Sequence, residues 1–375
     1  MRDFGTTVFA EMSALAIQTD SINLGQGFPD TDGPGELLEA AVDAIRGGHN
    51  QYPPGAGIPQ LRRAIAEHQR RCYALDFDAD AEVLVTAGAT EAIAAAILAL
   101  AGPGDEVVVF EPYYDSYAAC IALAGARRSP VTLRRDGAGW AFDPAELRAA
   151  VTPATVAILL NSPHNPTGKV FAAAELETIA AVAREHDLLI VSDEVYEHLT
   201  FDGRAHVPIA TLPGMRERTV TISSAGKTFS VTGWKIGWAC AVPPLLQAVR
   251  TVKQFLTYVS GAPFQPAVAR ALEAGPAYYT GAAAQLQRQR DQLCDGLAGL
   301  GWDVLAPQAT YFATVDVHRD AVGFCRELPH RAGVVAIPSS VFYDSPDGDS
   351  YVRFAFCKQP DVLDEALRRL KGSVP

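Results

Sequence analysis

The chain has 375 residues, of which 49% are hydrophobic and 20% charged, so it can build a large and a smaller core and is neither disordered nor fibrous. Its formal net charge of −12 argues against nucleic acid as a partner, because phosphate backbones are bound by basic surfaces. The N-terminus lacks the features of a signal peptide and no apolar run could span a membrane, so we expect a cytoplasmic protein.

The cysteines are scattered, with no C-x-x-C pair and no nearby histidine partner. This pattern predicts buried, reduced thiols rather than a disulfide framework or a metal site, and we expect no metal. The cysteines are Cys72, Cys120, Cys240, Cys294, Cys325 and Cys357.

The first three dozen residues are rich in glycine and proline and are expected to be loop-rich. From there to about residue 223, strand-like runs alternate with helical stretches. Strands are predicted at 83–86, 106–110, 128–133, 156–160, 188–192 and 219–223. Helices are predicted at 90–100, 116–124 and 175–185, and Asp143-Pro144 opens another short helix. The alternation predicts an α/β fold with a mainly parallel central sheet flanked by helices.

After about residue 265 the chain continues with a long helical stretch, short strands at 312–317 and 351–356, and a closing helix. We predict that the two ends of the chain form a smaller α+β domain. The expected large domain is 36–262, and the expected small domain combines 1–35 with 263–375.

Lys227 follows a predicted strand and has only small residues before it, in Ser223-Ser224-Ala225-Gly226-Lys227. Small neighbours leave room for a bulky group on the amine, and a lysine of lowered pKa can form an imine with an aldehyde. An ordinary loop lysine is the alternative. Ser224 and Lys235, the latter within Gly233-Trp234-Lys235-Ile236-Gly237, could both reach a phosphate.

These motifs, S-x-x-K followed by G-x-K-x-G, together with N-x-P-x-N-P-T-G from Asn161 to Gly168, resemble the class I and II aminotransferases of fold type I. The resemblance covers nearly the whole chain and implies pyridoxal 5′-phosphate (PLP) as cofactor, bound covalently by Lys227. The lysine at position 235 is typical of the kynurenine, glutamine and methionine transaminase subgroup. Several segments also resemble an actinobacterial branch that acts in lysine biosynthesis.

The resemblance implies a role for further residues around the PLP ring. Asp193, at the end of an apolar run, would keep the pyridine nitrogen protonated, so that the ring acts as an electron sink. Tyr196 and Asn165 would donate to the ring's 3-oxygen, and Tyr114 would cover the ring, with Tyr113 as the fallback. Without the resemblance, Asp193 could equally be a helix N-cap.

The family pattern also implies which residues bind the cofactor's phosphate and which residue contacts the second subunit. The amides of Ala89 and Thr90, between a predicted strand and a helix, would face the phosphate beside Ser224 and Lys235. Read alone, Gly88-Ala89 could be a plain turn. Tyr52 resembles the tyrosine that reaches the partner subunit's phosphate, which implies a homodimer with shared active sites.

Arg353 lies in an otherwise apolar strand, where an unpaired charge is unfavourable. The resemblance assigns it to the substrate's α-carboxylate, which a guanidinium can grip with two parallel hydrogen bonds. Gly27 and Asn165 are expected to line the same subsite. A structural salt bridge is the alternative for Arg353.

The implied reaction moves an amino group between an L-amino acid and a 2-oxo acid, with 2-oxoglutarate and glutamate as the expected pair. Lys227, Asp193 and Tyr196 are its expected catalytic residues. A cysteine-conjugate β-lyase would use the same residues. A non-catalytic, aminotransferase-like regulator would need a basic DNA-binding segment that the chain lacks, and a nicotinamide enzyme would need a glycine fingerprint that is also missing.

Overall fold

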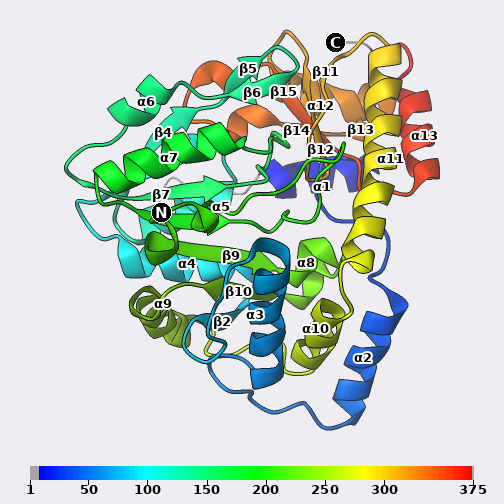
Figure 1. Ribbon diagram of the computed structural model, residues 1–375. Coiled ribbons are helices and arrows are strands. Elements are labelled where there is room, and N and C mark those ends of the chain that lie inside the picture. The colour runs from blue at the N-terminus through cyan, green and yellow to red at the C-terminus, as the bar shows by residue number, and fades with distance from the viewer. Residues whose placement is uncertain (1–7, 374–375) are drawn as a thin grey trace.

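The computed structural model describes residues 8–373, and its largest element is a seven-stranded sheet (Figure 1). Residues 1–7, which begin the expected small domain, lie outside the described residues. In spatial order the strands are β2 (Val83–Ala87), β10 (Ile236–Cys240), β9 (Thr219–Ser224), β8 (Leu189–Asp193), β7 (Thr155–Asn161), β3 (Glu106–Glu111) and β4 (Arg127–Thr132). All neighbours from β9 to β4 are parallel, which confirms the mainly parallel sheet, and β10 runs antiparallel to both of its neighbours.

Helices cover both faces of this sheet. One face packs against α4 (Gly88–Leu100), α5 (Asp115–Leu123) and α9 (Pro243–Leu256). The other packs against α6 (Pro144–Ala149) and α7 (Ala173–Glu185), and near β2 and β10 against α2 (Gly35–Arg46), α3 (Pro59–Tyr73) and α10 (Phe264–Glu273). Within β3, Val107 and Val109 join the first core and Val108 and Phe110 the second, which explains why the strand is apolar between its two terminal glutamates.

A second, four-stranded antiparallel sheet lies beside the first. Its order is β11 (Asp303–Leu305), β12 (Phe312–Asp316), β15 (Tyr351–Ala355) and β14 (Ile337–Pro338). Its helices are α1 (Val8–Gln18), α11 (Ala277–Gly299), α12 (Ala321–Ala332) and α13 (Pro360–Leu370). In one core, Met12 packs with Leu297, Val315 and Val352, and β1 (Ile22–Asn23) pairs with β13 (Val334–Val335). Figure 1 accordingly places the blue helix α1 among the orange C-terminal strands.

We propose, as the sequence predicts, that the two chain ends form a small domain beside the large one. The described packing favours a boundary after α10, because Val268 of α10 shares a core with Leu37 of α2 and Leu61 of α3. A hairpin of β5 (Arg134–Asp136) and β6 (Gly139–Ala141) completes the strands. No helix within residues 8–373 is both long and apolar enough to cross a bilayer.

The structure refines two local expectations. Residues 19–34 are mostly loop, as predicted, but the segment VFAEMSALAIQ before them consists mostly of good helix formers and folds as α1. The long helical stretch after residue 265 is divided into α10 and α11, since Gly275 has φ +90° and Pro276, which lacks a backbone N–H, follows it.

The strand register gathers one set of residues at a single edge of the large sheet. The parallel strands β7, β8 and β9 end there at Asn161, Asp193 and Ser224, with Asn161 directly opposite Asp193. Because β10 runs the other way, its start lies at the same edge, and Ile236 pairs with Ala87. This register places Lys235 beside Gly88, and the carboxyl edge is where open α/β sheets bind ligands.

Candidate active site

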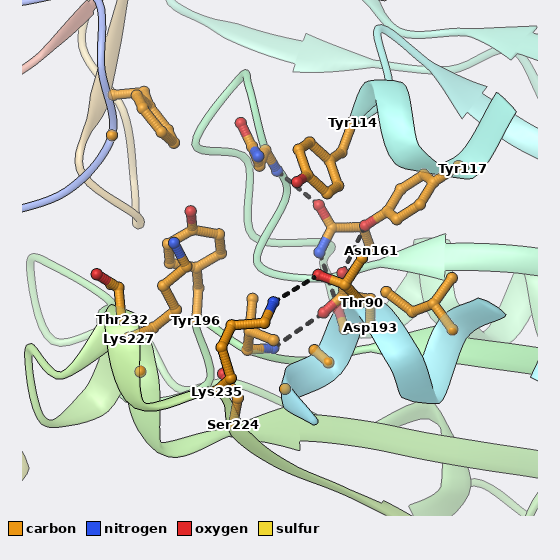
Figure 2. A pocket seen from close by; sticks show the side chains of 18 of the residues that line it. Thr90, Tyr114, Tyr117, Asn161, Asp193, Tyr196, Ser224, Lys227, Thr232 and Lys235 are labelled. Carbon is orange, nitrogen blue, oxygen red and sulfur yellow. Dashed lines mark hydrogen bonds between the residues drawn. The ribbon is translucent and has the colours of Figure 1, made fainter. Parts of the chain in front are cut away.

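A cavity of about 250 Å³ opens at this edge and is closed on the other side by the small sheet. The sequence-predicted residues that line it are Gly27, Ala89, Thr90, Tyr114, Asn165, Asp193, Tyr196, Ser224, Lys227, Lys235 and Arg353. Figure 2 shows lining side chains, ten of them labelled, that converge from the strand ends and from α4 and α5. Tyr52 is the exception among the predicted site residues.

Lys227 lies on α8 (Ala225–Thr228), a single turn that follows β9 directly. Its Nζ donates a hydrogen bond of 2.5 Å to the Tyr311 hydroxyl, which in turn donates to the Gly27 carbonyl at 2.6 Å. The residue as a whole is only half-buried, but burial of its amine lowers the pKa to about 8. About a tenth of the amine is therefore neutral and nucleophilic at about pH 7, and about half at about pH 8, far more than for a lysine of ordinary pKa.

Asp193 is a buried carboxyl group without an ion-pair partner among the described residues. Its Oδ2 accepts from the Tyr117 hydroxyl at 2.6 Å, and its Oδ1 accepts from the Val195 amide at 3.2 Å. Burial raises the pKa of Asp193 to about 6. No helix starts at this position, so the N-cap alternative fails. A protonated pyridine nitrogen would supply the cation that this carboxylate lacks, so the site fits PLP.

The ionised Asp193 should destabilise the protein without cofactor. Its folded pKa lies above the unfolded value near 3.9, so the folded chain binds the proton more tightly and stability falls as pH rises from about 4 to about 6. Asp193→Asn is expected to raise the free energy of unfolding of the cofactor-free protein by up to about 3 kcal/mol at about pH 7.5, and by little at about pH 4. Urea titrations at both pH values measure this difference, and an equal effect at both would contradict it.

The turn between β2 and α4 has the features of a phosphate cradle. Gly88 has φ +73°, and a Cβ there would lie 3.1 Å from the Lys235 Nζ. Lys235 donates to the Thr90 hydroxyl at 3.3 Å, as Figure 2 shows, and Ser224 ends β9 beside them. The amides of Ala89 and Thr90 open the helix α4, so an ammonium, hydroxyls and a helix N-terminus meet at one place. This combination suits a phosphate.

Arg353 is 2% exposed, and no carboxylate within residues 8–373 lies within ion-pair distance of it. Its Nη1 donates to Asn165 Oδ1 and its Nη2 to the Gly25 carbonyl, both at 3.2 Å, while its buried Nε has no partner in the described chain. The guanidinium carbon lies 3.9 Å from the Phe312 ring centroid. Burial lowers the pKa of Arg353 to about 10, so it remains charged at neutral pH. The salt-bridge alternative therefore fails here, and a bound carboxylate would complete the site.

Tyr113 and Tyr114, the two candidates for covering the ring, have different surroundings. Tyr114 lines the cavity, where burial raises its pKa to about 12. Tyr113 instead donates to Asp344 Oδ2 at 2.8 Å and does not line the cavity. Tyr196 packs edge-on against Tyr311, with ring centroids 5.3 Å apart, and the Lys227 Nζ lies 5.6 Å from the Tyr196 ring centroid.

The remaining two predicted residues differ in their placement. Gly27 lies at the cavity wall, where a Cβ would come within 2.3 Å of the Phe312 ring, so only glycine fits without a shift. Tyr52 is 83% exposed and packs edge-on against Tyr258 at 5.7 Å. A single chain thus does not bring Tyr52 to the cavity, and its expected role requires a second subunit.

The residues that sequence reasoning missed include four that contact the predicted ones. Asn161 stands at the start of the N-x-P-x-N-P-T-G motif, and Tyr117 lies three residues after Tyr114. Tyr117 donates to Asp193, and Asn161 donates to the Asp193 carbonyl at 2.9 Å and accepts from the Asn165 amide at 2.7 Å. Tyr311 and Phe312 carry no sequence signal, because only the tertiary fold brings them to Lys227 and Arg353.

Cys72 does have histidine neighbours, contrary to the expectation from the sequence. The ligand atoms of His68, Cys72 and His198 lie within 4.8 Å of one another. However, the two Nε2 atoms are already hydrogen-bonded at 2.7 Å, and the buried His68 Nδ1 has no acceptor among the described residues. Metal-bound histidines almost always donate their second N–H to an acceptor, so we place no metal here.

Known proteins match the chain over almost its full length. The sequence model of the family described as aminotransferase class I and II matches residues 19–370. The chain is 53% identical to the probable N-succinyldiaminopimelate aminotransferase of Mycobacterium tuberculosis, over 99% of this chain and 96% of that protein. It is 41% identical to the methionine aminotransferase of Escherichia coli, over 98% and 96%. The solved structure of the N-succinyldiaminopimelate aminotransferase from M. tuberculosis superposes with a TM-score of 0.97 and 54% identity, covering 99% of this chain and 98% of that one.

Proposed function

Because the chain belongs to the class I and II aminotransferases, we propose that it exchanges an amino group between N-succinyl-LL-2,6-diaminopimelate and 2-oxoglutarate, in lysine biosynthesis. It is a fold type I aminotransferase, and its cofactor is PLP. The observation that supports the substrate is the 53% identity, over nearly the full length of both chains, to a relative that carries this substrate in its name. Several segments of the sequence also resemble that branch of the family.

When bound, PLP withdraws electrons from the amino-acid substrate and so makes its α-hydrogen acidic. We assign the remaining work to residues of the cavity. Lys235, Thr90, Ser224 and the amide of Ala89 hold the phosphate, and Asp193 keeps the pyridine nitrogen protonated. These roles follow from one ammonium, two hydroxyls and a helix N-terminus at one end of the cavity and an unpaired carboxylate elsewhere in its wall.

The substrate end of the cavity orients the amino acid. Arg353 and Asn165 bind the α-carboxylate, and Gly27 keeps that wall free of side-chain atoms. Held in this way, the substrate would present its α-hydrogen to Lys227, which would take the proton as general base and deliver it as general acid to the C4′ carbon of the cofactor. Tyr196 donates to the ring oxygen beside Asn165, and Tyr114 covers the ring.

The substrate proposal is tested by comparing amino donors with 2-oxoglutarate as acceptor. We expect the highest kcat/KM for N-succinyl-LL-2,6-diaminopimelate, followed by methionine and glutamine, with kynurenine lowest. A higher kcat/KM for methionine would contradict the proposed substrate while leaving the transaminase assignment intact. Release of pyruvate and ammonia from a cysteine conjugate would identify β-lyase chemistry as a side activity.

We further propose a cytoplasmic homodimer in which Tyr52 reaches the partner subunit's phosphate. Support comes from exposed apolar side chains: Tyr258, which packs against Tyr52, is 51% exposed, and Phe255, three residues earlier in the chain, is 83% exposed. Such side chains, when clustered, mark protein interfaces. A sedimentation mass equal to one chain would contradict the dimer.

A further inference from the structure

We propose that Tyr311 is a positioning residue that orients the Lys227 amine while the amine acts as general base. The inference rests on the proposed function, in which Lys227 must leave the cofactor and work as a free amine. Tyr311 comes immediately before β12 in the small domain, whereas Lys227 follows β9 of the large sheet. The hydroxyl therefore connects the base to Gly27, which lines the cavity.

The hydrogen-bond directions define what Tyr311 can do. A phenol has one O–H donor, and Tyr311 gives it to the Gly27 carbonyl at 2.6 Å. Toward Lys227 it can only accept, and it does so at 2.5 Å. One N–H of the amine is thus fixed on Tyr311, and the nitrogen lone pair is left for the substrate's α-proton.

Tyr311 neither gains nor loses a proton during the transfer. The α-proton passes from the substrate α-carbon to the Lys227 Nζ, and Lys227 would then deliver it to the C4′ carbon of the cofactor, while the phenol keeps its own proton. Burial holds the pKa of Tyr311 well above its usual value, which keeps the phenol neutral throughout. Tyr311 is 1% exposed, so water does not compete for its hydroxyl.

The backbone next to Tyr311 is held in an unfavourable conformation. Thr310 has φ +70°, a left-handed conformation that is a genuine outlier for a β-branched residue. It is kept there by the bond from its amide to the Leu199 carbonyl at 2.9 Å and by the Phe312 amide, which donates to its hydroxyl at 3.3 Å. Strain of this kind is concentrated at functional sites, and here it sets the direction of Tyr311.

The Lys227 amine already lies on the Tyr311 side, at hydrogen-bond distance from the hydroxyl. A second, small cavity of about 50 Å³ is lined by Lys227, Tyr311 and Cys357. This cavity leaves space beside the Lys227–Tyr311 pair for small movements of the amine.

The test compares Tyr311→Phe with the wild-type holoenzyme. The ring contacts with Tyr196 should survive, and only the hydroxyl is lost. We expect kcat to fall by about 10- to 100-fold, with the donor KM within about twofold, because orientation of the base acts on the proton transfer. The kinetic isotope effect with an α-deuterated donor should rise. The matched control is Tyr279→Phe, which removes another buried phenol, bonded to Arg71 at 2.9 Å outside the cavity, and should leave all of these values unchanged.

A measurement independent of turnover uses the pyridoxamine phosphate form, in which Lys227 is free. Acetylation of Lys227 at a series of pH values, followed by peptide mass spectrometry, gives the pKa of its amine. Loss of an acceptor disfavours the ammonium, so the midpoint should move to lower pH in Tyr311→Phe. Unchanged kcat, isotope effect and midpoint in an active enzyme would overturn the role of Tyr311. Absence of transamination in the wild type would instead refute the proposed function.

Discussion

Replacement of Lys227 by alanine is expected to lower kcat for transamination by about 10⁴-fold and to leave the fold intact. The side chain supplies both the nucleophile that binds PLP and the general base, and a positioned base alone contributes about 10²- to 10⁴-fold. Because the amine is buried and its pKa is lowered by that burial, its removal should not reduce the melting temperature.

Two controls show whether the loss of kcat comes from the missing Lys227 side chain and not from misfolding. Lys371→Ala changes an exposed lysine at the end of α13 and should retain wild-type kcat. Circular dichroism of Lys227→Ala should match the wild type. A variant that folds normally and keeps kcat within about tenfold of the wild type would show that Lys227 is not the base.

Arg353→Met is expected to raise the KM of the amino donor by about 10²- to 10³-fold, because the substrate carboxylate loses a doubly hydrogen-bonded ion pair. The same change should not destabilise the protein. Arg353 is buried against aromatic rings with no carboxylate partner in the described chain, and replacing such a charge by an apolar side chain of similar size removes a desolvation penalty. Arg353→Lys should not restore the KM, because an ammonium lacks the planar fork.

Arg290→Met provides the matched contrast. Arg290 is also buried, but it pairs with Asp202 at 2.5 Å and Asp291 at 2.6 Å, outside the cavity. Its replacement should lower the melting temperature and leave the donor KM unchanged. If Arg353→Met lost as much stability as Arg290→Met and kept its KM, Arg353 would have a structural role instead.

Much of the large sheet was predictable from local patterns. Strands such as β7 and β8 are apolar in their central residues because helices cover both faces, and this leaves a clear signal in the sequence. β10 was missed, since Gly237 interrupts a short run beside a motif that reads as a loop. The α/β class follows from the alternation of elements, whereas the shared core of the two chain ends depends on contacts between distant segments.

The candidate site, too, could be predicted from the sequence only in part. Lys227, Asp193 and Arg353 stand in short motifs whose chemistry is recognisable residue by residue, and the structure brings all three to one cavity. Tyr311 could not be predicted, because its partner is 84 residues away in sequence and the approach is fixed by a strained backbone at Thr310. The role of Tyr52 rests on the sequence resemblance alone, since its proposed function depends on a second chain.

The covalent attachment of PLP to Lys227 is tested most directly by reduction of the holoenzyme with borohydride, followed by proteolysis and mass spectrometry. We expect the mass of the reduced cofactor on the peptide that contains Lys227, and on no other. Attachment at Lys235, or no attachment at all, would contradict the central role of Lys227.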